Sequence, residues 1–256
     1  MISEQWSGYA TGLFEKKSAL VKSLSRFVFR KANAVTAVSR FLEAKMQKAG
    51  LKNNYTITPN VVEPLEKNSS PLPANNKIKI LTVADLIDRI KNISATIEAV
   101  AEISKDNTNI EFHIIGHGKD EQLLKDLSKK LNVLDSFVFF HGVKTNEEVF
   151  QFLHACNFLV MNSRFETFSL VCIEAMSCGK PVIATDCGGP SEFMNKENGI
   201  LIEPGNHDQL TSALKKMISD FKTFDPQLLK HFAVTHFSTR ETGKKFEEIY
   251  RRVLAC

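Results

Sequence analysis

Between residues 77 and 220, short apolar runs alternate with segments that place apolar residues three and four positions apart. The short runs predict buried strands, and the periodic segments predict helices. Strands are expected at 77–84, 110–115, 137–140, 158–161, 181–184 and 199–202, and helices at 92–105, 121–131, 146–154, 169–178 and 207–220. This alternation with short turns predicts an α/β fold, a doubly wound parallel sheet with helices on both faces.

The N-terminal pattern is less regular. Residues 1–14 are aromatic and glycine-rich without a period, and we predict a loop there. Residues 15–31 place apolar residues at helical spacing among six lysines and arginines, which predicts a basic amphipathic helix. Such a helix either lies on an anionic membrane or packs its apolar stripe on a protein core, and we favour the core.

Four further elements are predicted toward the two ends of the chain. Short strands at 34–38 and 55–58 flank a helix that Ser39 caps. Near the C-terminus, Ser238 and Glu241 have the spacing of a capping box, which predicts a last helix.

Composition narrows the function classes. The 256 residues are 43% hydrophobic and 24% charged, which is ordinary for a globular protein, and the net charge of +4 decides little. The five cysteines are odd in number and form no C-x-x-C pair, so we predict free thiols in a reducing cytosol without a disulfide or zinc site. No apolar run approaches the roughly 18 residues of a membrane span, and the N-terminus lacks a signal-peptide pattern.

Several chemistries lack their motifs. The turn Gly116-His117-Gly118 has neither the third glycine nor the later acidic residue of a dinucleotide fingerprint, which argues against NAD. The seven histidines show no metal-ligand spacing, and no G-x-S-x-G elbow is present. Dense basic and aromatic interleaving, typical of nucleic-acid binding, is also missing. We therefore expect no metal and no nucleic-acid partner.

In an open parallel sheet, ligands bind beyond the carboxyl ends of the strands. Glu166 and Glu174 lie eight residues apart around a predicted helix start in such a position. If all eight steps were helical, their Cα atoms would lie about 12 Å apart, the length of a nucleotide-sugar. The backbone N–H groups of Phe168, Ser169 and Leu170 open this helix and can hold a pyrophosphate without a metal.

The run SRFETFSLVCIEAMSCGKPVIATDCGGPSE resembles the signature of GT-B glycosyltransferases of family 4, retaining enzymes whose E-x7-E hallmark falls here on Glu166 and Glu174. The resemblance continues in order through AVTAVSRFL, KILTVADLIDRIKN, EFHIIGHGKD, FVFFHGV and NGILIEPGNHDQL, from residue 33 to 217. It implies metal-independent transfer of a hexose-type sugar from a UDP- or GDP-linked donor to a saccharide or lipid-linked acceptor, with no cofactor.

The resemblance implies a role for each site residue. Glu166 would bond the hydroxyls of the donor sugar and is the nearest to a catalytic residue. Glu174 would accept from the ribose hydroxyls, a role suited to a carboxylate that stays ionised. The amides of residues 168–170 would hold the pyrophosphate, and Lys91, just past a strand, would stabilise the leaving diphosphate.

The nucleotide base would lie against Gly116 and the segment around Gly142 and Val143. One departure concerns the turn before Lys91, where the family usually has V-G-R-L and this chain reads VADL. Either Asp85 points away from the diphosphate, or Arg89 supplies the second cation.

The resemblance implies a Rossmann-like C-terminal half of a GT-B fold with only a partial N-terminal domain. The expected divisions are a remnant of the acceptor-binding domain, a polar proline-rich linker, the nucleotide-sugar-binding domain and a helix that packs back toward the N-terminal part: 1–62, 63–76, 77–236 and 237–256. The alternatives are the donor-binding half of a two-chain transferase and an inactive nucleotide-sugar-binding fragment; an epimerase is disfavoured. An exposed apolar face on 15–31 and on the C-terminal helix would favour the two-chain alternative.

Overall fold

The computed structural model describes residues 1–65 and 71–255. Residues 66–70 of the predicted linker and Cys256 lie outside the described residues.

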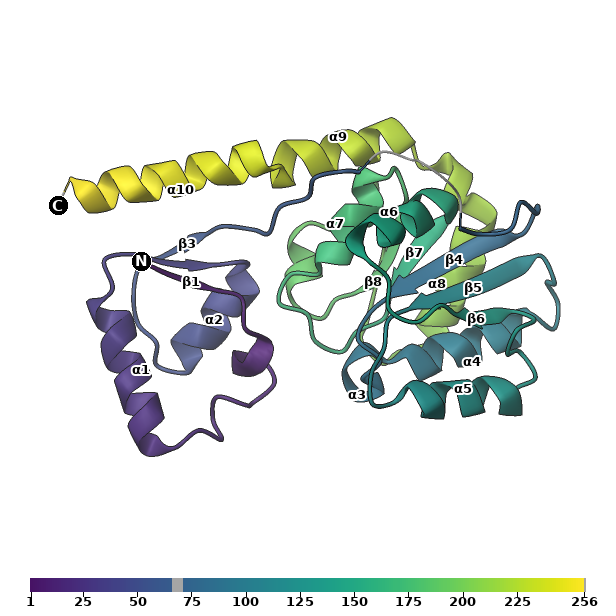
Figure 1. Ribbon diagram of the computed structural model, residues 1–256, viewed down its shortest axis with the longest axis horizontal. Helices are drawn as coiled ribbons and strands as arrows, with labels where there is room; N and C mark the ends of the chain where they lie inside the picture. Colours follow the sequence, from purple (N-terminus) through teal and green to yellow (C-terminus); the bar gives the residue numbers. More distant parts are fainter. Residues whose placement is uncertain (66–70, 256) are drawn as a thin grey trace.

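The larger part of the chain is built on a six-stranded parallel sheet with the order β6-β5-β4-β7-β8-β9 (Figure 1). Its strands are β4 (Ile78–Val83), β5 (Ile110–Ile115), β6 (Val138–Phe140), β7 (Phe158–Met161), β8 (Val182–Thr185) and β9 (Gly199–Ile202). All six were expected from their apolar runs, and the doubly wound fold is confirmed.

Helices cover both faces of this sheet because its strands are apolar on both sides. Ile80 of β4 packs with one set of helices: α4 (Ile93–Ile103), α5 (Glu121–Lys130) and α8 (His207–Asp220). Leu81, the next residue, packs with the other set: α6 (Asn146–Ala155), α7 (Leu170–Ser177) and α9 (Pro226–Phe237). Neighbouring strand residues point to opposite faces, so one apolar run supplies both cores.

The sheet has a topological switch point beside β4. The chain winds outward from β4 through β5 to β6 and then returns to form β7 on the other side of β4. Connections therefore leave the carboxyl ends of β4 and β7 in opposite directions, which opens a crevice between them.

The first 62 residues form a smaller parallel sheet with the order β1-β2-β3 (Figure 1). The strands are β1 (Ile2–Glu4), β2 (Val35–Ala37) and β3 (Tyr55–Ile57). The segments between them form a 3-10 turn η1 (Ser7–Tyr9) and the helices α1 (Ala19–Lys31) and α2 (Arg40–Lys48). The loop predicted for residues 1–14 is wrong at β1, because Ile2 is the one apolar residue of this strand and gives no apolar run to recognise.

Helix α1 carries an exposed apolar stripe. Its side chains are 44–78% exposed and belong to Leu20, Val21, Leu24, Phe27 and Val28, which we call the α1 stripe. Phe29, on the opposite side of the helix, is the buried residue of α1. The expectation that the stripe packs on a core is therefore wrong for the described residues, since periodicity identifies an apolar face but not what covers it.

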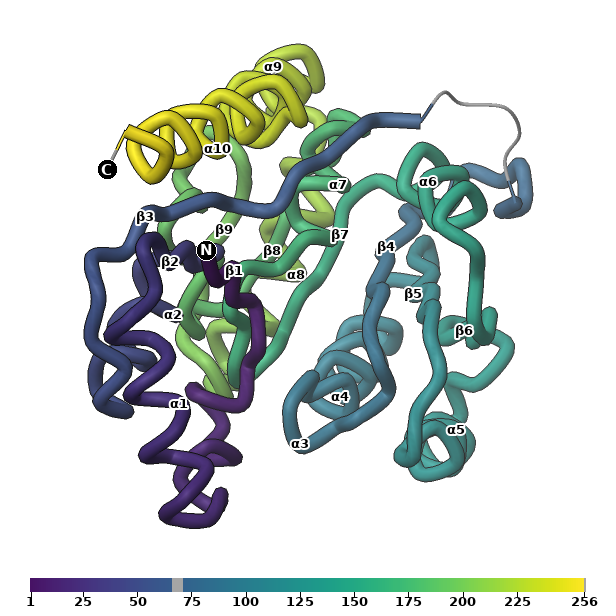
Figure 2. Tube along the Cα trace, turned by 60° about the vertical axis from the view of Figure 1, so that its left-hand side comes forward, coloured from purple at the N-terminus to yellow at the C-terminus, as the bar shows by residue number. Residues whose placement is uncertain are grey.

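The C-terminal helix α10 (Thr239–Leu254) follows α9 and returns to the smaller sheet, as Figure 2 shows near β3. Arg252 donates to Thr56 of β3 at 3.4 Å, and Ser238 caps the helix as predicted. Helix α9 and the single turn α3 (Asp88–Lys91) lie outside the predicted elements.

Candidate functional site

A cavity of about 190 Å³ opens at the switch point, where β4 and β7 end. Its wall is formed by residues 82–84 at the carboxyl end of β4, residues 160–163 at the carboxyl end of β7, and residues 169–171 at the start of α7. Lys91 and Glu166 add the charged groups of the lining. The cavity therefore lies where an open α/β sheet binds its ligand.

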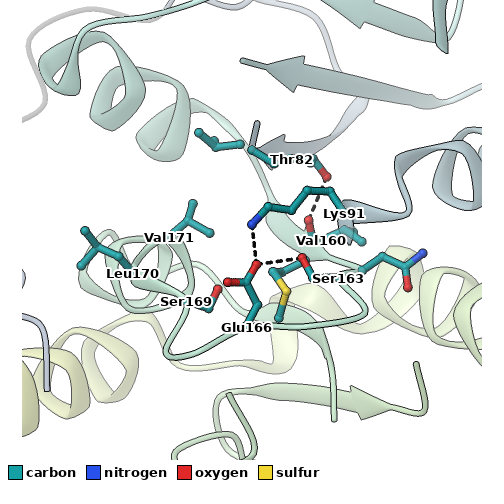
Figure 3. A pocket seen from close by; sticks show the side chains of 12 residues that line it. Thr82, Lys91, Val160, Ser163, Glu166, Ser169, Leu170 and Val171 are labelled. Atoms are coloured by element: carbon teal, nitrogen blue, oxygen red, sulfur yellow. Dashed lines mark hydrogen bonds and ion pairs between the residues drawn. The ribbon is translucent and has the colours of Figure 1, made fainter. Parts of the chain in front are cut away.

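Lys91 and Glu166 form an ion pair in this cavity (Figure 3). The Lys91 Nζ atom lies 2.6 Å from Glu166 Oε1, and the Ser163 hydroxyl donates to the same oxygen at 2.8 Å. The side chains are only 23% and 15% exposed, so both charges are partly desolvated. Glu166 Oε2 has no hydrogen bond among the described residues and is available to a ligand.

Backbone contacts fix the position of both charged residues. Lys91 ends α3, where the left-handed Asn92 redirects the chain into α4. The Arg164 amide donates to the Ile90 carbonyl at 2.7 Å and joins this turn to the loop that carries Glu166. On the other side, the Gly189 amide donates to the Glu166 carbonyl at 2.9 Å. The ion pair is thus set by two loops distant in sequence.

The first turn of α7 faces the cavity. Ser169, in a left-handed conformation with φ of 74°, and Leu170 both line it. The first N–H groups of a helix have no carbonyl partner within it and carry the positive end of the dipole. Phe168 differs, because its side chain is buried among Phe193 and Phe237, with ring centroids 5.5 and 5.6 Å away.

Glu174 lies one turn further along α7 and does not line the cavity. Only the steps from Leu170 to Glu174 are helical, so the separation expected for eight helical steps does not apply. Burial raises the pKa of Glu174 to about 7, which leaves the carboxyl partly protonated at neutral pH. This differs from the expectation of a carboxylate that stays ionised, because the sequence alone did not indicate how deeply the side chain is buried.

Gly116 and Val143 lie at the same edge of the sheet, beyond β5 and β6, outside the cavity. Gly116 has φ of +134°, and a Cβ there would lie 1.9 Å from the Ala84 carbonyl oxygen, so only glycine fits. Its amide donates to the Gly142 carbonyl at 2.9 Å, while Val143 is 73% exposed. Gly116 thus lies against Ala84, which lines the cavity.

Asp85 and Arg89, in the segment where the sequence differs from the family pattern, do not line the cavity. Asp85 and Arg89 are both exposed, and neither contributes to the wall around Lys91. Lys91 is therefore the one predicted cation that the structure places against Glu166.

No sequence motif indicated the polar residues directly after β7. Ser163 bonds Glu166, and Asn162 donates to the Asn92 carbonyl at 3.1 Å, while Thr185 holds the Ser163 carbonyl at 2.5 Å. The available signal was their place after a buried strand, where parallel sheets carry ligand-binding groups.

No group of three or more His, Cys, Asp or Glu side chains is arranged to hold a metal ion within residues 1–65 and 71–255. In the same ranges, no helix is long and apolar enough to cross a membrane. The four described cysteines are free and buried: Cys156, Cys172, Cys178 and Cys187. Burial raises the pKa of each thiol.

Comparison with known proteins supplies independent findings. A family model described as "Glycosyl transferases group 1" matches residues 63–225. An uncharacterised glycosyltransferase of Methanocaldococcus jannaschii is 34% identical over 131 residues, covering 51% of this chain and 35% of the relative. One component of the phosphatidylinositol N-acetylglucosaminyltransferase of Arabidopsis thaliana is 27% identical over 199 residues, covering 77% of this chain and 44% of the relative. The chain thus spans less than half the length of these relatives.

Solved structures share the fold. Sucrose-phosphate synthase from Thermosynechococcus elongatus superposes with a TM-score of 0.83 at 21% identity, over 99% of this chain and 68% of that one. Anabaena HepE in complex with UDP superposes with a TM-score of 0.80 at 22% identity, over 93% and 69%.

Proposed function

Since the chain belongs to the glycosyl transferases group 1 family, we propose that it is a retaining GT-B enzyme of family 4. It would transfer a hexose-type sugar from a UDP- or GDP-linked donor to a saccharide or lipid-linked acceptor. The Lys91–Glu166 pair beside the first turn of α7 carries this proposal. It sets a cation, a carboxylate and helix amides around one cavity, as a diphosphate-linked sugar requires.

The size of the cavity fits part of such a donor. Its volume of about 190 Å³ is below the roughly 300–1,000 Å³ usual for pockets that enclose a whole small molecule. The diphosphate and sugar fill it, and the base extends over the neighbouring surface beside Gly116 and Val143. This placement gives the predicted base-binding residues a role outside the cavity.

The charges suit departure of a diphosphate without a metal ion. Lys91 and the amides of α7 stabilise the negative charge that develops on the leaving group. Glu166 is held through Oε1 by Lys91 and Ser163, so Oε2 accepts from a sugar hydroxyl. Glu174 accepts from the ribose hydroxyls once it is ionised.

The comparisons support the choice of donor and acceptor classes. HepE was solved with UDP and with UDP-glucose, which favours a uridine donor here. A Campylobacter jejuni relative, 32% identical over 148 residues, acts on a diphospho-undecaprenol-linked acceptor by its name, which favours a lipid-linked acceptor. We place the protein in the cytoplasm, a compartment that the buried free thiols fit.

Calorimetry tests the donor site directly. UDP and GDP are titrated into the wild type and the Lys91→Ala and Lys105→Ala variants, each with and without EDTA, and Lys91→Ala should bind more weakly than the other two. Lys105 is exposed and serves as the control. We expect UDP to bind the wild type and Lys105→Ala equally, and EDTA to change nothing. If neither nucleotide binds the wild type, the donor-site assignment fails.

A second candidate function is favoured by the α1 stripe. Five apolar side chains of a 13-residue helix are exposed side by side, which marks an interaction surface. We propose that, in a two-chain transferase, another polypeptide covers this stripe and helps to hold the acceptor. The basic residues beside the stripe also suit an anionic membrane, and the test in the Discussion separates the two partners.

A further inference from the structure

Glu192 connects the two parts of the chain at the N-terminus of α2. Its carboxylate accepts from the amides of Arg40 at 3.0 Å and Phe41 at 2.8 Å. Ser39 satisfies the next amide, because its Oγ accepts from Leu42 at 3.1 Å. A carboxylate at this position also interacts favourably with the helix dipole. Glu192 thus acts as an N-terminal cap supplied from 152 residues away.

Beside this contact a groove of about 450 Å³ runs between the two parts of the chain. It is lined by Val38 and Ile57 on one side and by Phe193 and Phe237 on the other, and Glu192 also lines it. Buried apolar residues of both parts form one cluster, which holds the parts together without regard to direction. Directed polar contacts beside the groove add a defined orientation to that packing.

Those contacts converge on the loop that carries Glu166. Ser39 Oγ donates to the Thr167 carbonyl at 2.5 Å, and Thr167 Oγ1 donates to the Gln5 carbonyl at 3.4 Å. Glu192 belongs to the 3-10 turn η2 (Gly189–Glu192), whose Gly189 amide holds the Glu166 carbonyl. A Cβ on Gly189 would lie 2.3 Å from the Thr167 carbonyl oxygen, so turn and loop are in tight contact.

We infer that Glu192 is a positioning residue that couples the orientation of the N-terminal part to the placement of Glu166. The inference rests on the proposed donor site. A bound donor restricts the motion of the Glu166 loop. Because η2 and the Glu192 carboxylate connect this loop to α2, the motion of the first turn of α2 is restricted as well. Glu192 touches no part of the donor cavity, so it acts through the loop.

Amide hydrogen exchange, read by mass spectrometry on peptides 38–46 and 164–172, tests this coupling. The variants are Glu192→Ala, Glu192→Gln, which keeps one acceptor oxygen, and Glu197→Ala. Glu197 is an exposed control whose described hydrogen bond is made by its backbone. Each protein is measured alone and with saturating UDP.

We expect Glu192→Ala to speed exchange at least tenfold in the first turn of α2 and severalfold in 164–172, with partial recovery in Glu192→Gln. UDP should slow exchange of 38–46 in the wild type and in Glu197→Ala but not in Glu192→Ala, an effect that a purely local cap would not produce. UDP affinity should stay within twofold in all variants. Exchange in 164–172 that is unchanged by Glu192→Ala overturns the inference, whereas failure of the wild type to bind UDP overturns the proposed function instead.

Discussion

The ammonium of Lys91 lies 2.6 Å from a carboxylate oxygen of Glu166, although 75 residues separate them in the chain. The pair is assembled by the segments that follow β4 and β7. Partly desolvated charges at this distance interact far more strongly than a surface ion pair. The protein therefore holds a cation and a carboxylate ready where strands β4 and β7 diverge.

Replacing Lys91 with alanine should weaken UDP binding by about 10- to 100-fold, as expected for loss of one charge-assisted contact to phosphate. Calorimetry at low salt measures the change. The variant also leaves Glu166 partly buried without its cation, so a small loss of thermal stability should accompany it. Lys105→Ala serves as control, and equal affinities for the two variants would contradict a phosphate-binding role for Lys91.

Glu174 should make stability fall as pH rises. Its pKa in the folded protein is about 7, above the value near 4.5 of an unfolded chain, so the folded state binds this proton more tightly between the two values. Ionising it between pH 5 and 8 should cost up to about 3 kcal/mol. Denaturant titrations of wild type and Glu174→Gln at both pH values should show this loss in the wild type alone. A variant with the wild-type pH dependence would refute the assignment.

UDP affinity should rise with pH over the same interval if the ionised Glu174 receives the ribose hydroxyls. With a pKa of about 7, the ionised fraction grows about tenfold between pH 6 and 8. The dissociation constant of the wild type should fall by a similar factor beyond any change in Glu174→Gln. Parallel pH profiles would exclude Glu174 from the ribose contact.

Gly116→Ala should destabilise the fold by more than about 2 kcal/mol, because its Cβ would meet the Ala84 carbonyl at 1.9 Å and its φ is +134°. Gly142→Ala should destabilise the fold less, since its φ is +66° but no atom lies within 4 Å of the added Cβ. Gly243→Ala, within α10 and also in open space, should stabilise by up to about 1 kcal/mol. A different order of the three unfolding temperatures would contradict the close approach of Gly116 to Ala84.

The double variant Leu24→Glu and Phe27→Glu should make the α1 stripe polar and prevent apolar association through it. We expect the wild type to bind an apolar dye and to self-associate in light scattering, and the variant to do neither. Leu123→Glu, at a 56% exposed leucine on α5, is the matched control. A monodisperse, dye-negative wild type would count against a polypeptide partner. Sedimentation with anionic vesicles, but not with zwitterionic ones, would favour the membrane instead.

The six-stranded sheet could be predicted from sequence because buried parallel strands are continuous apolar runs. Two short elements could not: β1 (ISE) has a single apolar residue, and α3 is one turn of four residues, too short to show a helical period. The position of α7 was predicted within a residue, and Glu166 lies in the loop before it, as that prediction requires.

Within the site, residue types were easier to predict than their environment. Lys91 and Glu166 were identified, but their contact depends on the Arg164–Ile90 hydrogen bond between loops, which no spacing encodes. The pKa of Glu174 depends on how neighbouring elements bury α7, which is a property of the packed structure. Side chains that reach across the fold, such as Glu192, carry no local signal at all.

The winding of the sheet also determines when a donor cavity exists. Ile80 of β4 pairs with Phe158 of β7, and the strands between them in sequence lie on the other side of β4. Such non-local pairings form slowly, so incompletely assembled chains have no cavity to fill. A nucleotide present at about 100 times its dissociation constant would add roughly 2.7 kcal/mol to the completed sheet alone. A bound donor would thus stabilise molecules whose sheet is complete and leave those that are still folding unaffected.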